Sequence, residues 1–218
     1  MSLGADPAAV LDPEPPRRSA RRMLLVLLVA LLAAAVGFGA GIATAVPRHP
    51  GDESAEAGFA RDMITHHGQA VAMATLEYRG TTDTGLRTMA VDIALTQQAQ
   101  IGMMSTWLDT WGLSPTTTRP AMAWMSGGAA TASSDGLMPG MATPAQMNEL
   151  KAATGRDRDV LFCQMMIRHH LGGIHMADAI LRQSDNGQVT ALAQTMKDGQ
   201  QYDITVLQDA LKRLGATP

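Results

Sequence analysis

Apolar residues recur at helical spacing in four long segments of the chain, and no stretch shows the alternation of a half-buried strand. The segments are Ser54 to Arg79, Leu86 to Gly112, Asp157 to Gln183 and Gln188 to Leu214. Turns rich in Gly, Asp, Ser and Thr join the first to the second and the third to the fourth. A shorter helix is expected after Thr143, where Thr-Pro-Ala-Gln forms a capping box. The pattern predicts an all-α fold, a four-helix bundle made of two hairpins.

A fifth apolar segment, residues 23–46, contains no charged residue and directly follows a cluster of four arginines. A signal peptide has an apolar stretch of roughly 7–15 residues, whereas roughly 20 residues span a bilayer as a helix. We therefore expect an uncleaved transmembrane helix; cleavage after residues 43–45, which would give a secreted protein, is the alternative. The arginines predict a cytoplasmic N-terminus and an extracytoplasmic remainder.

These patterns give the expected domain organisation. It consists of a basic cytoplasmic tail (1–22), a transmembrane anchor or signal (23–46), a linker (47–53) and a bundle domain (54–215) with a methionine-rich loop at 114–142.

The second hairpin repeats the first at a constant offset of 103 residues, without a gap. The repeated residues are Phe59, Met63, His66, His67, Met73 and Arg79, matched by Phe162, Met166, His169, His170, Met176 and Arg182. Because the register holds through two helices and the turn between them, we expect a duplicated helical hairpin with a pseudo-twofold axis.

Composition excludes several classes of function. The net charge of −3 leaves no basic face for nucleic acid, and aromatic residues make up only 4% of the chain. A single cysteine, Cys163, excludes an internal disulfide, and we expect it to be a buried, inert thiol rather than part of a site.

No interior acid pair or nucleophile is evident, so we do not expect an enzyme. Methionine is unusually frequent, with 16 residues.

The histidines of each repeat lie on the same helical face as methionines. His66 lies between Met63 and Met73 on one stripe, and the second repeat places its histidines in the same way. A lone histidine on an apolar face is usually a core residue, but two copies at identical spacing favour metal ligation, since burying each polar group costs free energy. The candidate ligands are His66, His67, Met63, Met73, His169, His170, Met166 and Met176. Interior Gln97 or Gln200 is a candidate hydrogen-bond partner for an imidazole.

Thioether and imidazole ligands together suit copper, because methionine favours Cu(I) and histidine accepts both Cu(I) and Cu(II). A di-iron site is excluded, since none of the five glutamates lies in a Glu-x-x-His motif. We expect an extracytoplasmic copper-binding protein for copper storage, tolerance or delivery, with a copper-exchanging protein as a further partner. The alternatives are a bundle that binds haem non-covalently through the same residues and a structural module without metal.

Four methionines of the central loop leave two alternatives open. Met122, Met125, Met138 and Met141 form either a flexible segment that captures Cu(I) or a lid packed on one end of the bundle.

The two His-His segments, from Phe59 to Ala74 and from Phe162 to Ala177, resemble the doubled signature of the domain-of-unknown-function 305 family. Met138-Pro139-Gly140-Met141 also resembles the methionine-rich loop of that family. The resemblance covers about residues 54–215 and implies a ferritin-like four-helix bundle, often exported, in a family that includes copper-binding proteins. The chain departs from the family pattern at Gln100 and Asp203, where a glutamate usually precedes the isoleucine.

Overall fold

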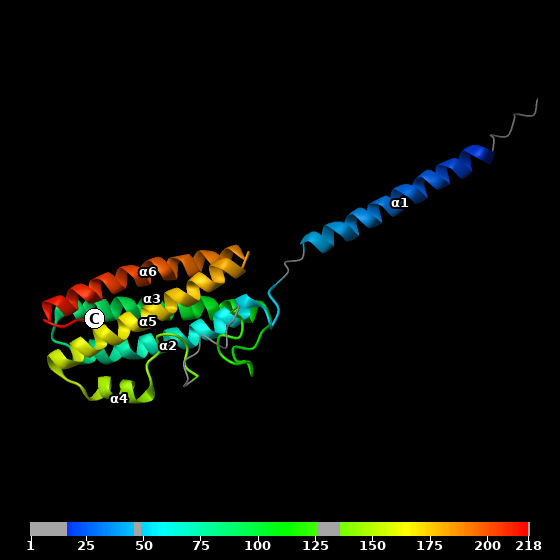
Figure 1. Ribbon diagram of the computed structural model, residues 1–218. Helices are drawn as coiled ribbons and strands as arrows, with labels where there is room; N and C mark the ends of the chain where they lie inside the picture. Colours follow the sequence, from blue (N-terminus) through cyan, green and yellow to red (C-terminus); the bar gives the residue numbers. More distant parts are fainter. Residues whose placement is uncertain (1–16, 46–48, 126–135, 218) are drawn as a thin grey trace, which may run out of the picture. The chain divides into compact units, whose positions relative to one another are not determined.

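The structure is a computed structural model that describes residues 17–45, 49–125 and 136–217. Within these ranges every regular element is an α-helix, so the all-α prediction is confirmed (Figure 1). The chain divides into two units, residues 1–48 and 49–218, which we describe one at a time.

The first unit contains a single helix, α1 (Arg17–Ala45). Its most apolar window, Arg21–Phe38, has a mean hydropathy of 2.1 and is exposed along its whole length. A helix of 29 residues is about 43 Å long, more than the roughly 30 Å of a bilayer's hydrocarbon core. The helix begins before residue 23, where we expected the apolar segment to begin, because the arginine-rich stretch is helical too.

The second unit is the bundle. Its elements are α2 (Ala55–Gly80), α3 (Thr84–Thr110), α4 (Pro144–Ala152), α5 (Gly155–Gln183) and α6 (Gly187–Arg213). The helix α2 packs along α3 and α5 packs along α6, which gives the two expected hairpins (Figure 1). The helices α2 and α5 run in opposite directions and pack against each other, whereas α3 and α6 approach each other much less closely. The short helix α4 lies against α2 and α5.

Local signals fix the ends of the bundle helices. The side chains of Ser54, Asp83 and Asn186 accept hydrogen bonds from backbone N–H groups of the first turns of α2, α3 and α6. Thr143 and Gln146 form the expected capping box of α4. After α3 and α6 the chain reverses through glycines at positive φ, 69° at Gly112 and 66° at Gly215, a conformation that costs glycine little.

The buried apolar side chains form two clusters along the bundle. One cluster includes Met73, Phe162 and Met166, and the other includes Phe59, Met63 and Met176. The loop residues Met122, Trp124, Met125 and Met138 are buried in the second cluster. Of the two alternatives for the loop methionines, the described part of the loop therefore adopts the packed one; its residues 126–135 lie outside the described residues.

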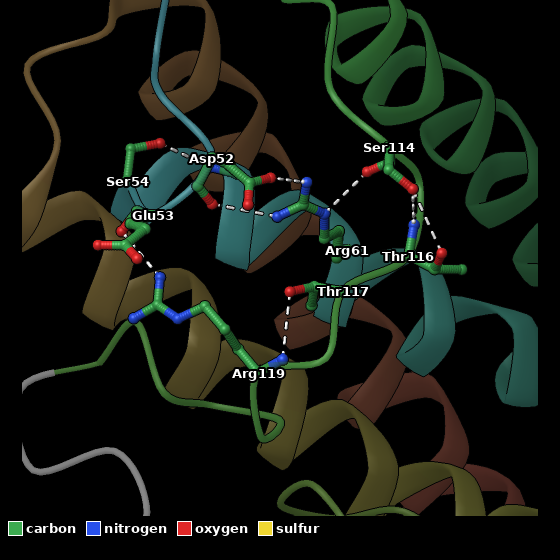
Figure 2. Close-up of polar contacts among 9 residues, drawn as sticks. Asp52, Glu53, Ser54, Arg61, Ser114, Thr116, Thr117 and Arg119 are labelled. Atoms are coloured by element: carbon green, nitrogen blue, oxygen red, sulfur yellow. Dashed lines mark hydrogen bonds and ion pairs between the residues drawn. The ribbon is translucent and has the colours of Figure 1, made fainter.

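A buried arginine on α2 ties the chain before and after the first hairpin to the bundle (Figure 2). The Arg61 guanidinium donates to the Asp52 backbone oxygen and carboxylate and to the Ser114 backbone oxygen. Arg119 donates to the Glu53 backbone oxygen, which adds a second link between the same two segments. The entry to α2 and the exit from α3 are thus held at the same end of the bundle.

Candidate metal centre

Four buried histidines lie where α2 packs against α5. The exposed fraction is 0% for His66, His67 and His170 and 1% for His169. The rings of His66 and His169 are in contact, with centroids 3.8 Å apart and planes tilted by 32°. The centroid of the His170 ring lies 6.3 Å from that of His169. The pairs that sequence periodicity predicts on two separate helices thus meet in the interior.

Each of the four histidines uses its Nε2 atom in one hydrogen bond. The Nε2 of His66 is 3.0 Å from the Pro139 backbone oxygen, and the Nε2 of His169 is 3.0 Å from the His66 backbone oxygen. The Nε2 of His67 lies 2.7 Å from Gln100 Oε1, and that of His170 lies 3.0 Å from Asp203 Oδ2. A carbonyl or carboxylate oxygen only accepts, so each Nε2 carries the hydrogen and donates it.

The other ring nitrogen of each histidine has no partner. The Nδ1 atoms of His66, His67, His169 and His170 are all buried without a hydrogen bond. In a neutral ring whose Nε2 holds the hydrogen, the Nδ1 atom presents a lone pair. Metal-binding histidines show this same division, with one nitrogen on the metal and the other donating to a carbonyl or carboxylate.

Burial favours the neutral form of three of these rings. Desolvation lowers the pKa of His66 to about 4, although the bond to Pro139 opposes the shift. Desolvation and the nearby His66 lower the pKa of His67 to about 3. The pKa of His169 is also well below its ordinary value, again through desolvation first. A neutral imidazole is the form that binds a metal, and no proton has to be removed from it at neutral pH.

The four candidate methionines are all buried but fall into two groups. Met63 and Met176 belong to one apolar cluster, and Met73 and Met166 belong to the other. The helices α2 and α5 are antiparallel (Figure 1). The order of the residues along each helix therefore places one pair on each side of the histidines. The structure therefore places the four methionines in two pairs, each with one methionine from α2 and one from α5.

The histidines do not by themselves form a metal site with each other, or with Cys, Asp or Glu, in the part of the chain that the structure describes. No three His, Cys, Asp or Glu side chains are grouped there so that they could hold an ion. Binding of a metal by these histidines requires other donors, and methionine sulfur is the donor type that the surrounding core supplies.

The profile of the family described as "Domain of unknown function (DUF305)" matches residues 56–211, from the first turn of α2 to near the end of α6. The chain belongs to the DUF305 family.

Solved structures of DUF305 proteins share the fold. A secreted DUF305 protein from Streptomyces coelicolor is 40% identical, with a TM-score of 0.70 over 77% of this chain and 98% of that one. A DUF305 fragment from Deinococcus radiodurans is 26% identical, with a TM-score of 0.62 over 77% of this chain and 99% of its own. CopM in its Cu(I)-bound form is 21% identical, with a TM-score of 0.55 over 73% of this chain and 96% of its own. No curated protein matches the chain.

The hydrogen-bond partners of the histidines in this DUF305 chain differ from those expected. Gln100 and Asp203 accept from His67 and His170, whereas both polar atoms of Gln97 and the Oε1 of Gln200 have no partner. The expectation for Gln97 and Gln200 is therefore wrong by one helical turn. The signal lay in the equal spacing, since each acceptor follows its histidine by 33 residues in both hairpins.

The partner of His66 comes from the Met138–Met141 loop, which packs closely on α5. A Cβ atom at Gly172 would lie 1.9 Å from the Pro139 backbone oxygen, and one at Gly140, where φ is 77°, would lie 2.3 Å from the Arg168 backbone oxygen. Gln69 also pairs with both the backbone N–H and the backbone oxygen of Ala142. The two glycines thus allow the close approach that brings a loop carbonyl to the His66 ring.

Cys163 and Glu77 are two other buried titratable groups of the DUF305 bundle. Burial raises the pKa of the Cys163 thiol to about 12, so the cysteine is protonated and unreactive at neutral pH. Burial, and then the nearby Asp159, raise the pKa of Glu77 to about 8. Glu77 therefore keeps its proton at neutral pH. His175, which has no counterpart in the first hairpin, is exposed on α5.

Proposed function

We propose that this protein binds copper through the Nδ1 atoms of its buried histidines and the thioethers of the adjacent methionines. The observation that carries the proposal is the set of four buried Nδ1 atoms without a hydrogen-bond partner. An unpartnered buried polar group costs roughly 1–3 kcal/mol, so four such atoms on the two packed helices α2 and α5 require an explanation. A metal ion that binds there would repay this cost.

The donor set favours copper over other metals. Neutral imidazole nitrogen and thioether sulfur are soft or borderline ligands, which suit Cu(I) and, through the imidazole, Cu(II). The protein CopM, which shares the fold, has been solved in Cu(I)-bound and Cu(II)-bound forms. The proposed ligands are those expected from the sequence, namely His66, His67, Met63, Met73, His169, His170, Met166 and Met176.

The location of the methionines supports two binding positions rather than one. Met63 and Met176 lie to one side of the histidine rings, and Met73 and Met166 lie to the other. Each position would combine a thioether from α2 and one from α5 with imidazole nitrogens from the centre. Copper held in a buried position of this kind suits storage, tolerance or delivery to a copper-exchanging protein.

Replacing the methionines tests this assignment. Two double variants are made, Met63→Leu with Met176→Leu and Met73→Leu with Met166→Leu. We expect each to weaken Cu(I) binding much more than Cu(II) binding, because the thioether sulfur that favours Cu(I) is removed while the imidazoles remain. Leucine nearly conserves volume, so each substitution should cost under about 1.5 kcal/mol of stability. Competition with a chelator whose Cu(I) complex is coloured measures the effect on Cu(I) affinity. Met103→Leu is the matched control, since Met103 is 51% exposed on α3. Unchanged Cu(I) affinity in both double variants would exclude the methionines as ligands.

We further propose that α1 is an uncleaved anchor that holds the bundle outside the cytoplasm. The length and hydropathy of α1 and the arginines at its N-terminal end support this, and a secreted relative fits export.

A reporter enzyme fused after Pro218 should be active outside the cytoplasm, and the same reporter fused after Arg22 should stay inside. The chain should remain with membranes after a carbonate wash, because a spanning helix resists extraction. Release of a soluble form that begins near Val46 would show that the segment is cleaved.

A further inference from the structure

The methionine pair Met63 and Met176 is closed off from solvent, since both side chains are 0% exposed. An ion reaches their sulfur atoms only when a segment that covers them moves. Their apolar cluster includes three side chains from the chain segment that follows α3, namely Met122, Trp124 and Met125. We call residues 121–125 the strap. The strap is not helical, so it can move without disrupting a helix of the bundle.

A single carboxylate oxygen holds the strap on α2. The Oδ2 atom of Asp62 accepts a 2.7 Å hydrogen bond from the Met122 backbone N–H and a 2.8 Å hydrogen bond from the Trp124 Nε1–H. Within the described ranges, all hydrogen bonds from the strap to the bundle helices go to this one atom. Asp62 directly precedes Met63 on α2, so the attachment of the strap lies next to a covered methionine.

Trp124 approaches α2 closely because a glycine leaves room for it. A Cβ atom at Gly58 would lie 2.5 Å from the Trp124 Cβ and 2.6 Å from two atoms of its indole ring. The indole also meets the Phe59 ring edge to face, with centroids 5.7 Å apart and planes at 83°. Phe59 lies one helical turn before Met63. The indole therefore covers the turn of α2 that leads to Met63.

The strap is held in a strained conformation. At Met122 the φ angle is 66°, and no other residue except glycine has a positive φ in the described part of the chain. Such a conformation costs a residue with a side chain free energy and persists only where its surroundings hold it. The backbone N–H of this residue is one of the two groups that Asp62 binds. Loss of the Asp62 bonds would therefore let the strap relax away from the bundle.

The second hairpin has no equivalent attachment. The offset of 103 residues places Met165 at the position of Asp62 and Leu161 at the position of Gly58. Neither the carboxylate nor the room for an indole is thus repeated. The cluster that contains the other methionine pair includes a residue of the helix α4 instead. The two proposed copper positions are therefore closed in different ways.

We propose that the strap gates the Met63–Met176 position and that Asp62 is the latch that keeps it shut. When the two bonds to Asp62 break, the strap moves away and Cu(I) reaches the two sulfur atoms without a change of oxidation state. The chain just before the strap stays attached, because Arg119 donates to the Glu53 backbone oxygen (Figure 2). The inference rests on the proposed copper function and adds how one of its two positions is reached.

The first test needs no copper. In a chain with Trp107→Phe and Trp111→Phe, Trp124 is the only tryptophan left, and acrylamide quenching of its fluorescence reports whether the strap is closed. We expect Asp62→Ala to raise the open fraction at least about a hundredfold, about tenfold for each lost bond to the carboxylate. Asp62→Asn should keep the strap largely closed, since the amide oxygen accepts the same two bonds. A Trp124 that stays protected in the Asp62→Ala chain would overturn the latch.

The second test measures the rate of Cu(I) uptake without oxygen, in the intact chain purified in detergent. The Met73→Leu, Met166→Leu chain keeps the methionine pair under the strap, and the Met63→Leu, Met176→Leu chain keeps the other pair. Asp62→Ala should speed uptake at least about tenfold in the first chain, the effect of one lost bond to the carboxylate. It should leave the uptake rate of the second chain unchanged, and the final Cu(I) content should not change in either.

Three further variants complete the test. Gly58→Ala should also speed uptake, because the added methyl group displaces Trp124, and it probes the strap with the latch residue in place. Gly68→Ala is its control on the same helix, since a Cβ atom there would meet nothing within 4 Å. Asp109→Ala removes an exposed carboxylate of α3 and matches the charge change of Asp62→Ala. Both controls should leave the uptake rate unchanged.

The direction of the change identifies the role of Asp62. Slower uptake in both Asp62→Ala and Asp62→Asn would show that the carboxylate attracts the ion, and would overturn the latch. An unchanged uptake rate in the Asp62→Ala and Gly58→Ala chains, with Trp124 exposed to acrylamide, would overturn the gate and leave the copper function intact. Absence of Cu(I) binding by the unmodified chain would overturn both.

Discussion

Lowering the pH from 7 to 5 is expected to destabilise the metal-free bundle by a net of roughly 3 kcal/mol, because a larger loss at the buried histidines is partly offset by Glu77. An unfolded histidine titrates near pH 6.5, whereas the pKa of His66 is about 4 and that of His67 about 3 in the folded chain. Between these values the unfolded chain binds protons that the folded chain does not, so the free energy of unfolding falls as the pH falls. Each of these two histidines contributes about 2 kcal/mol to the loss, and His169 acts in the same direction.

Glu77 opposes this trend. Its pKa is raised to about 8 in the folded chain, so it keeps a proton that the unfolded chain releases above about pH 4.5, and its contribution to stability grows as the pH falls. We expect Glu77→Gln to make the loss of stability below pH 6.5 steeper and to stabilise the chain above pH 8. Denaturant titrations at several pH values measure both effects. Stability that stays flat from pH 7 to pH 5 would contradict the burial of neutral histidines.

The second large effect is expected from His169→Leu. The substitution removes a buried Nδ1 without a partner, and it leaves only the His66 backbone oxygen without the imidazole donor. That oxygen lies inside α2, where a helical N–H group also donates to it. Stability of the metal-free chain should therefore stay unchanged or rise. Copper affinity should fall by more than the roughly 10–100-fold that loss of a ligand's hydrogen-bond partner costs.

Two further variants make this prediction specific. His66→Leu should lose copper as well but should cost about 1 kcal/mol of stability, because the Pro139 backbone oxygen loses its donor. His175→Leu is the matched control on the same helix, since His175 is exposed, and it should change neither property. A lower Tm of the metal-free His169→Leu chain, with copper uptake undiminished, would show that His169 is a structural core residue and not a copper ligand.

The helices and their ends are predictable from the chain because their signals are local. Apolar spacing marks the buried face of each helix, and Ser54, Asp83, Thr143 and Asn186 cap their own first turns. The inward orientation of the four histidines follows from the same periodicity. The resemblance to the DUF305 family is confirmed by the match over residues 56–211.

The partners of the histidines are harder to predict because they depend on long-range register. Gln97 and Gln100 lie one turn apart on α3 and are both buried, so periodicity alone does not distinguish them. The acceptor for His66 is a backbone oxygen, which has no signature in the sequence. The position of the loop depends on tight contacts of Gly140 and Gly172 with backbone atoms, and these arise only when α5 and the loop meet.

Metal retention under matched competition tests the central claim most directly. The intact chain, purified in detergent, is dialysed against equal buffered concentrations of copper, iron and zinc, with haem in a parallel sample. Metal content is measured by elemental analysis, and haem by its Soret absorbance. The proposed ligands predict that copper is retained in stoichiometric amount in preference to iron, zinc and haem, and that the His66→Leu, His169→Leu chain loses it. Stoichiometric iron or zinc without copper, or a Soret band at full occupancy, would contradict the assignment.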